Sequence, residues 1–88
     1  YAKENIRVVA VCPGSIDTPL LKDAVSLSFD KVDEGMHEIG NKHPLGRIGN
    51  PSEIADVILF LSSEKASFIT GEYICVDGGL MAKGAWGG

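Results

Sequence analysis

The sequence predicts an α/β fold in which one crossover helix joins two parallel strands, a βαβ unit of a doubly wound parallel sheet. Residues 6–12 form an apolar run with no polar alternation, which is typical of a central strand covered on both faces. Residues 72–76 form a second β-rich run, and a strongly capped helix is predicted at 51–63 between them. Such a unit is expected to be right-handed, with its two strands parallel.

Composition limits both the size of the domain and its partners. The 88 residues allow at most one small domain with a marginal core, and no apolar run is long enough to span a membrane. Eight basic and 12 acidic residues give a formal charge of −4 without any basic cluster, so we expect neither nucleic acid nor membrane as a partner. Small molecules and proteins remain.

Cysteine usage and the lack of a targeting segment bear on the compartment. Cys12 and Cys75 both lie in strand-like runs and outside metal-ligand spacing, so we expect buried thiols in a reducing compartment. No signal-like or transit-like segment is present, which favours a cytoplasmic location.

Residues 1–5 are interpreted as the end of a helix that precedes the first strand. Helix formers are followed by Asn5, a residue that tolerates the left-handed conformation at a helix end. A parallel strand at 6–12 needs a preceding crossover helix and a neighbouring strand with which to pair. We therefore expect the 88 residues to be the carboxyl-terminal part of a larger protein.

Residues 13–19 form the loop that is expected to end the first strand at Cys12. Pro13 cannot donate a hydrogen bond to a ladder, and Gly14 permits a sharp turn or the close approach of a ligand. Ligands of open α/β sheets bind beyond the carboxyl ends of the strands. Taken by itself, a Pro-Gly pair after an apolar run favours a plain strand-ending turn. The polar side chains of this loop are Ser15, Asp17 and Thr18.

Residues 20–43 are interpreted as a weakly structured lid with two short amphipathic helices. The acidic residues of the second helix fit a solvated face better than a catalytic pair. Asp33 and His37, with His43 nearby, could in principle flank a metal, but lone histidines on short helices usually face solvent. No metal site is expected. The apolar positions that predict the two helices are Leu20, Leu21, Ala24 and Val25, and then Phe29, Val32, Met36 and Ile39.

A turn-rich connector leads from His43 into the helix at 51–63. Asn50 is a good N-cap, Pro51 suits the first helical position, and Glu53 stands where a capping box places it. Arg47 is interpreted either as an anion ligand or as a partner of carbonyls or of a neighbouring carboxylate. The apolar residues of the helix are more than one sheet face can bury: Ile54, Ala55, Val57, Ile58, Leu59, Phe60 and Leu61.

Residues 77–88 form a glycine-rich tail that is expected to be flexible. Its single Trp86 is expected to be either disordered or docked on a partner.

Three motifs in this order resemble the carboxyl-terminal third of the short-chain dehydrogenase/reductase family. The first runs from Asn5 through the Pro-Gly-x-Ile-x-Thr loop at 13–18 and is similar to the family's sixth strand and cofactor loop. The second, Pro-Leu-Gly-Arg at 44–47 with 49–55, is similar to the start of its last long helix. The third, from 67 to 79, is similar to its seventh strand.

The resemblance implies a Rossmann-like sheet, a cofactor that is NAD or NADP, and a small carbonyl or alcohol substrate. By position, it implies that Pro13 and Gly14 shape the cofactor loop and that the backbone of Ile16 meets the nicotinamide carboxamide. The hydroxyl of Thr18 would bond to the carboxamide or the pyrophosphate. The family's glycine-rich turn, catalytic Ser and Tyr-x-x-x-Lys pair are expected upstream of these residues and have no counterpart here. Tyr1 is not that tyrosine, since Asn5 and not Lys stands four positions after it. No catalytic residue is assigned, and the 88 residues alone are expected to be inactive.

Two functions from different classes remain. The first is part of an NAD(P)-dependent oxidoreductase that transfers hydride, and the second is a non-catalytic fragment or scaffold that keeps the family's subunit-contact surfaces. A stand-alone binding module is disfavoured, because a two-stranded sheet with one helix rarely folds alone. The helix from Pro51 and the strand from Tyr73 are expected to form a subunit contact, which gives a dimer or, by resemblance, a tetramer.

Overall fold

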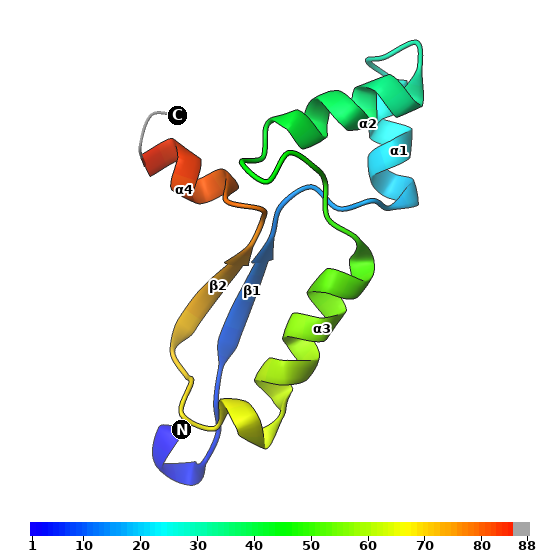
Figure 1. Cartoon of the computed structure of the whole chain (residues 1–88). Coiled ribbons are helices and arrows are strands. Elements are labelled where there is room, and N and C mark those ends of the chain that lie inside the picture. Colours follow the sequence, from blue (N-terminus) through cyan, green and yellow to red (C-terminus); the bar gives the residue numbers. More distant parts are fainter. Residues whose placement is uncertain (86–88) are drawn as a thin grey trace.

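The computed structural model describes residues 1–85. Helix α3 runs alongside two strands, while α1, α2 and α4 gather beyond the carboxyl ends of those strands (Figure 1). No helix within residues 1–85 has the length and apolar character needed to cross a membrane. The elements in chain order are η1 (Ala2–Glu4), β1 (Val9–Pro13), α1 (Pro19–Ser26), α2 (Val32–Asn41), α3 (Pro51–Ser62), η2 (Glu64–Ala66), β2 (Glu72–Val76) and α4 (Leu80–Ala85).

The two strands pair in parallel, which confirms the predicted α/β class. The register sets Val9 opposite Glu72 and Pro13 opposite Val76. Strand β2 has the predicted bounds, and α3 begins at the predicted Pro51 and ends one residue before the predicted Ser63.

Strand β1 differs from the predicted 6–12 at both ends. It begins only at Val9 because its partner β2 begins at Glu72, and residues before Val9 have no strand beside them. Pro13 does not end the strand. The Gly14 N–H donates to Val76 O at 3.1 Å, so donors alternate along β1 and the nitrogen of Pro13 faces the edge away from β2. A proline at that position removes no bond between the two strands.

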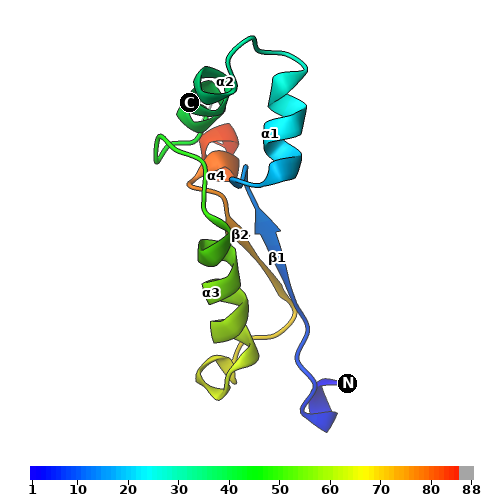
Figure 2. The same ribbon diagram turned by 90° about the vertical axis from the view of Figure 1, so that its right-hand side faces the viewer.

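One face of the sheet is covered and the other is bare within the described part of the chain. Val9 and Val11 are half-buried and line the same cleft as Ile58 and Leu61 of α3. Figure 2 shows α3 on one side of the strands and no helix along the other. The prediction that both thiols are buried is therefore wrong for this chain. The exposed side chains of the bare face include the register partners Cys12 and Cys75, together with Ala10 and Tyr73.

Helix α3 carries more apolar surface than the sheet covers, as its sequence predicts. Leu61 is buried against the sheet, whereas Leu59 is 72% exposed and Phe60 is 46% exposed. The predicted reciprocal cap at its start is present, with the Glu53 carboxylate accepting from the Asn50 N–H at 3.0 Å.

The segment 20–43 is more ordered than the weakly structured lid that its sequence suggested. Helices α1 and α2 pack against each other around the buried Val25. The contact depends on Gly35, because a Cβ there would lie 2.4 Å from Val25 Cγ1 and 2.7 Å from the Phe29 ring. A small residue at this crossing lets the two short helices approach closely.

Both ends of the chain contain short helices. The expected helix end at 1–5 is a 3₁₀ turn, and Asn5 adopts the predicted left-handed conformation at φ 61°. The tail predicted to be flexible contains α4, because the Asp77 carboxylate accepts from the N–H groups of Gly79 and Met81 at 3.0 Å each. The prediction for Trp86 lies outside the described residues.

Candidate functional site

The loop at 13–19 is held against the connector at 43–50 by a short parallel bridge between Ile16 and Gly49. The Asp17 N–H donates to Gly49 O at 2.8 Å, and the Gly49 N–H donates to Ser15 O at 2.9 Å. Both bonds use the backbone of Gly49 and of the residues on either side of Ile16. The loop is therefore fixed by main-chain groups.

This bridge sets the direction of the two peptide planes that contain Ile16. In a trans peptide the C=O and N–H point in opposite directions. Because the Ser15 C=O accepts from the Gly49 N–H, the Ile16 N–H of the same peptide points away from the connector. In the same way, the Asp17 N–H donates to the Gly49 C=O, so the Ile16 C=O of that peptide also points away from the connector. Among residues 1–85 no group hydrogen-bonds to either one. Ile16 thus presents one donor and one acceptor on the same side of the loop.

Gly14 has a different role from the one its sequence context predicted. Its φ is not in the left-handed region, so no sharp turn requires glycine there. The close approach is to protein, because a Cβ on Gly14 would lie 2.9 Å from Asp77 Cα and 3.1 Å from His43 Nε2. The missing side chain lets the start of the loop pack against the end of β2.

The structure does not bring the three polar side chains of the loop to one point. Thr18 is the N-cap of α1, and its Oγ1 accepts from the Leu21 N–H at 3.2 Å. Because a hydroxyl also carries a proton, Thr18 can still donate one bond to a ligand. Asp17 instead pairs with Lys22 at 3.5 Å, with both side chains substantially exposed.

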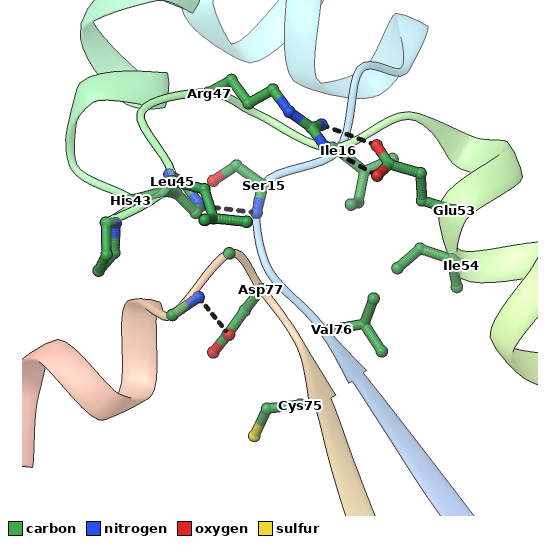
Figure 3. A pocket seen from close by; sticks show the side chains of 14 residues that line it. Ser15, Ile16, His43, Leu45, Arg47, Glu53, Ile54, Cys75, Val76 and Asp77 are labelled. Carbon is green, nitrogen blue, oxygen red and sulfur yellow. Dashed lines mark hydrogen bonds and ion pairs between the residues drawn. The ribbon is translucent and has the colours of Figure 1, made fainter.

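His43 is a site residue that sequence reasoning missed. It is 4% exposed, which contradicts the expectation of a solvent-facing histidine, whereas His37 is exposed as expected. Its Nε2 lies 3.2 Å from Ser15 N (Figure 3). Its Nδ1 lies 3.0 Å from Ile39 O. Its partner Ser15 lies 28 positions away in the sequence, so no local pattern could have found the contact.

These segments surround a cleft of about 430 Å³ at the carboxyl ends of the strands. Both sides of the bridge contribute, and the helix α3 and the turn after β2 close it (Figure 3). Within residues 1–85, no group of three or more His, Cys, Asp or Glu side chains is placed to hold a metal ion. The lining includes Ser15, Ile16, His43, Arg47, Ile54 and Asp77.

Arg47 pairs with a carboxylate, one of the two roles considered for it. Its guanidinium donates to both carboxylate oxygens of Glu53 at 2.8 and 2.9 Å, and to Ile48 O at 3.1 Å. The hydrogen bond from Arg47, with a second from the Asn50 N–H, lowers the pKa of Glu53 to about 2. The pair ties the connector to the first turn of α3.

This lowered pKa predicts an acid-sensitive start of α3. A carboxyl whose pKa is lower in the folded state adds stability above its unfolded pKa, near 4.5, and that stability is lost as the pH falls towards 2. We expect Glu53→Gln to lower the thermal unfolding midpoint of the full-length protein at pH 7, with the difference from wild type shrinking between pH 4.5 and 2. Asp56→Asn on the same helix is the control, because Asp56 is exposed and makes no ion pair among the described residues. A difference that stays constant with pH would exclude the ion pair as its cause.

Comparison with known proteins identifies the family of the chain. A family model described as enoyl-(acyl carrier protein) reductase matches residues 1–81. The crystal structure of a short chain dehydrogenase family protein from Francisella tularensis superposes with a TM-score of 0.87 at 40% identity, covering 92% of this chain and 35% of that one. The chain belongs to the short-chain dehydrogenase/reductase family.

Two further members of the short-chain dehydrogenase/reductase family show the extent of the match. The 3-oxoacyl-[acyl-carrier-protein] reductase FabG of Thermotoga maritima is 46% identical over 86 residues, which is 92% of this chain and 32% of that protein. The structure of YwfH, an NADPH-dependent reductase involved in bacilysin biosynthesis, superposes with a TM-score of 0.82 at 38% identity, covering 91% of this chain and 32% of that one. The chain thus spans about 30% of the length of the curated relatives it matches.

Proposed function

We propose that these residues are part of an NAD(P)-dependent oxidoreductase that transfers a hydride between a nicotinamide cofactor and a small carbonyl or alcohol substrate. The observation that carries the proposal is the unpaired N–H and C=O of Ile16, which face the same side of the loop. A primary carboxamide offers one acceptor and two donors, so it can bond to both groups at once. The nicotinamide ring carries such a carboxamide, and the family relative YwfH is an NADPH-dependent reductase.

Gly14, Ile16 and Thr18 have different proposed roles in binding the cofactor. Gly14 sets the distance between the loop and the end of β2, and Ile16 orients the nicotinamide ring through its carboxamide. Thr18 adds a hydroxyl donor for the carboxamide or pyrophosphate. The bound cofactor supplies or accepts the hydride, and the lid formed by α1 and α2 covers the substrate beside it.

We also propose that the segment is the carboxyl-terminal third of its parent protein. The edge of β1 that faces away from β2 and the face opposite α3 both lack partners among residues 1–85, as expected for strands taken from the interior of a larger sheet. The parent would supply the glycine-rich turn and the Ser, Tyr and Lys of the catalytic step. The intact mass of the native polypeptide tests this placement, because a native chain of 88 residues would favour the non-catalytic alternative.

The parent is proposed to be a dimer or a tetramer. The outer side of α3 leaves Leu59 and Phe60 exposed, and an apolar surplus of this size usually marks a contact surface. Strand β2 has an unpaired edge, where the Tyr73 N–H is satisfied by the Glu72 carboxylate at 3.1 Å. A two-fold axis beside α3 and β2 would bury both features in one isologous contact.

Replacing Thr18 tests the cofactor site. In the full-length protein, Thr18→Val is expected to weaken cofactor binding by about 0.5–1.5 kcal/mol, the contribution of one hydrogen bond. Titration of NADH and NADPH by fluorescence measures it, with thermal unfolding alongside because the variant also removes the cap of α1. Thr18→Ser keeps both the cap and the donor and is expected to bind as the wild type does.

Two outcomes would contradict the assignment. Unchanged cofactor affinity in Thr18→Val would remove Thr18 from the site. A full-length protein that binds neither NADH nor NADPH would refute the proposed function itself. The isolated 88-residue segment is expected to transfer no hydride in the same assay.

A further inference from the structure

His43 connects two parts of the molecule that are far apart in the sequence. Ser15 N–H can only donate, so Nε2 must be the acceptor in the 3.2 Å contact. The ring proton therefore resides on Nδ1, which donates to Ile39 O at 3.0 Å. The imidazole is neutral in this arrangement, and both of its nitrogens are used.

The two partners of His43 belong to different functional parts. Ile39 lies in the last turn of α2, the second helix of the lid, and Ser15 lies in the cofactor loop. The ring also packs on the loop backbone, because a Cβ added at Gly14 would lie 3.1 Å from Nε2. A displacement of α2 therefore acts on the peptide plane between Gly14 and Ser15.

That peptide plane immediately precedes the one that directs the Ile16 N–H. Ser15 is held at its N–H by His43 and at its C=O by the Gly49 N–H, at 3.2 and 2.9 Å. The first bond comes from the lid side and the second from the connector. Together they leave little freedom to the residue that orients Ile16.

We propose that His43 is a positioning residue that couples the lid to the nicotinamide-binding loop. Closure of α2 over the substrate and correct orientation of Ile16 towards the cofactor then favour each other through one neutral imidazole. The inference rests on the proposed function, since it assigns a second duty to the same loop. A histidine that only fills the core would stabilise the fold without linking the two parts.

Two amide variants separate these roles, because each keeps one of the two hydrogen bonds. In His43→Gln the side-chain oxygen can reach the position of Nε2 and accept from Ser15, whereas in His43→Asn the amide can reach only the position of Nδ1 and donate to Ile39. Each variant loses one bond, so their unfolding midpoints are expected to be similar. Any difference between them in cofactor binding then reports on the Ser15 contact.

The expected results concern affinity and coupling in the full-length protein. His43→Asn and His43→Leu are expected to raise the cofactor dissociation constant about three- to tenfold, the range of one neutral hydrogen bond, while His43→Gln stays close to wild type. Binding of NADH or NADPH should slow hydrogen exchange at the α2 amides in the wild type and in His43→Gln, but not in His43→Asn. The maximal rate at saturating cofactor should fall less than the affinity does.

Three results would contradict the proposal that His43 couples the lid to the loop. Equal affinity loss in His43→Gln and His43→Asn, in step with their unfolding midpoints, would make His43 a structural residue only. Cofactor-induced protection of α2 that is the same in both variants would exclude the coupling. If the wild type binds no cofactor, the proposed function fails and not merely the role of His43.

Nuclear magnetic resonance of the wild-type protein tests the same proposal without any substitution, and so does not depend on whether a variant folds. The nitrogen-15 shifts of the His43 ring should show a protonated Nδ1 and an unprotonated Nε2, and the Nε2 shift should change when the cofactor binds. A proton on Nε2, or an Nε2 shift unaffected by the cofactor, would overturn the inference.

Discussion

Replacement of Phe60 by glutamate in the full-length protein is expected to separate the proposed oligomer into monomers. Phe60 and Leu59 lie on the outer side of α3, 46% and 72% exposed, while Leu61 on the other side is buried against the sheet. A carboxylate in an apolar contact has no partner there, and an unpaired buried charge costs about 3–5 kcal/mol. We therefore expect the dissociation constant of the contact to rise by at least about two orders of magnitude. Sedimentation velocity at micromolar concentration measures it.

A matched substitution distinguishes this surface from exposed apolar residues in general. Leu27 is 87% exposed and is the C-cap of α1, a helix that lies beyond the carboxyl ends of the strands and apart from α3 (Figure 1), so Leu27→Glu is expected to leave the assembly intact. A wild type that sediments as a monomer would refute the contact. An intact oligomer in Phe60→Glu, with a lowered unfolding midpoint, would show instead that residues of the same subunit cover this side of α3.

Alanine in place of Gly14 is expected to destabilise the protein and weaken cofactor binding together. The added Cβ would lie 2.9 Å from Asp77 Cα and 3.0 Å from Asp77 Cβ, and backbone atoms at that distance must shift. Overpacking of this kind costs about 1–3 kcal/mol. The shift would move the loop away from the end of β2 and carry the Ile16 peptide groups with it. Thermal unfolding and cofactor titration of the full-length protein measure the two effects.

Gly49→Ala is the control for this substitution. A Cβ at Gly49 would also approach at 2.9 Å, but the atom it meets is Cδ1 of Ile16, the flexible end of a side chain. That end can move without changing the bridge, so a smaller effect on both measurements is expected. Equal losses in Gly49→Ala and Gly14→Ala would show that contact with the Asp77 backbone is not the cause of the effect at Gly14.

The elements that the sequence predicted well are those specified by local residues. The start of α3 follows from the Asn50–Pro51–Glu53 cap, and β2 follows from a β-rich run between turn residues. The bounds of β1 could not be predicted in this way, since its first residue is decided by where β2 begins. The helix α4 is not predicted because its glycines suggest flexibility, whereas in the structure the Asp77 carboxylate holds its start through the N–H groups of Gly79 and Met81.

In the candidate site, too, features set by local residues are predicted from the sequence and features set by distant contacts are not. The sequence predicts a loop at the carboxyl end of β1 only to within one residue, because Pro13 belongs to the strand, and the general rule for α/β sheets predicts a ligand there. The direction of the Ile16 peptide groups depends on Gly49, and the burial of His43 depends on Ser15 and Ile39. The contacts of Ile16 with Gly49 and of His43 with Ser15 join segments about 30 positions apart, and such contacts leave no periodic pattern in the sequence.

The bridge between Ile16 and Gly49 has a consequence for how this site tolerates change in evolution. What Ile16 offers to a ligand is a pair of main-chain groups, which every residue except proline possesses. Side-chain replacements at this position, proline excepted, can therefore drift while this donor and acceptor stay in place. The number of residues between β1 and the bridge cannot drift in the same way. One residue inserted between β1 and the bridge would turn this donor and acceptor to the opposite side, because successive residues of an extended chain face opposite ways. The length of the loop therefore matters more for these main-chain groups than the side chain of Ile16 does.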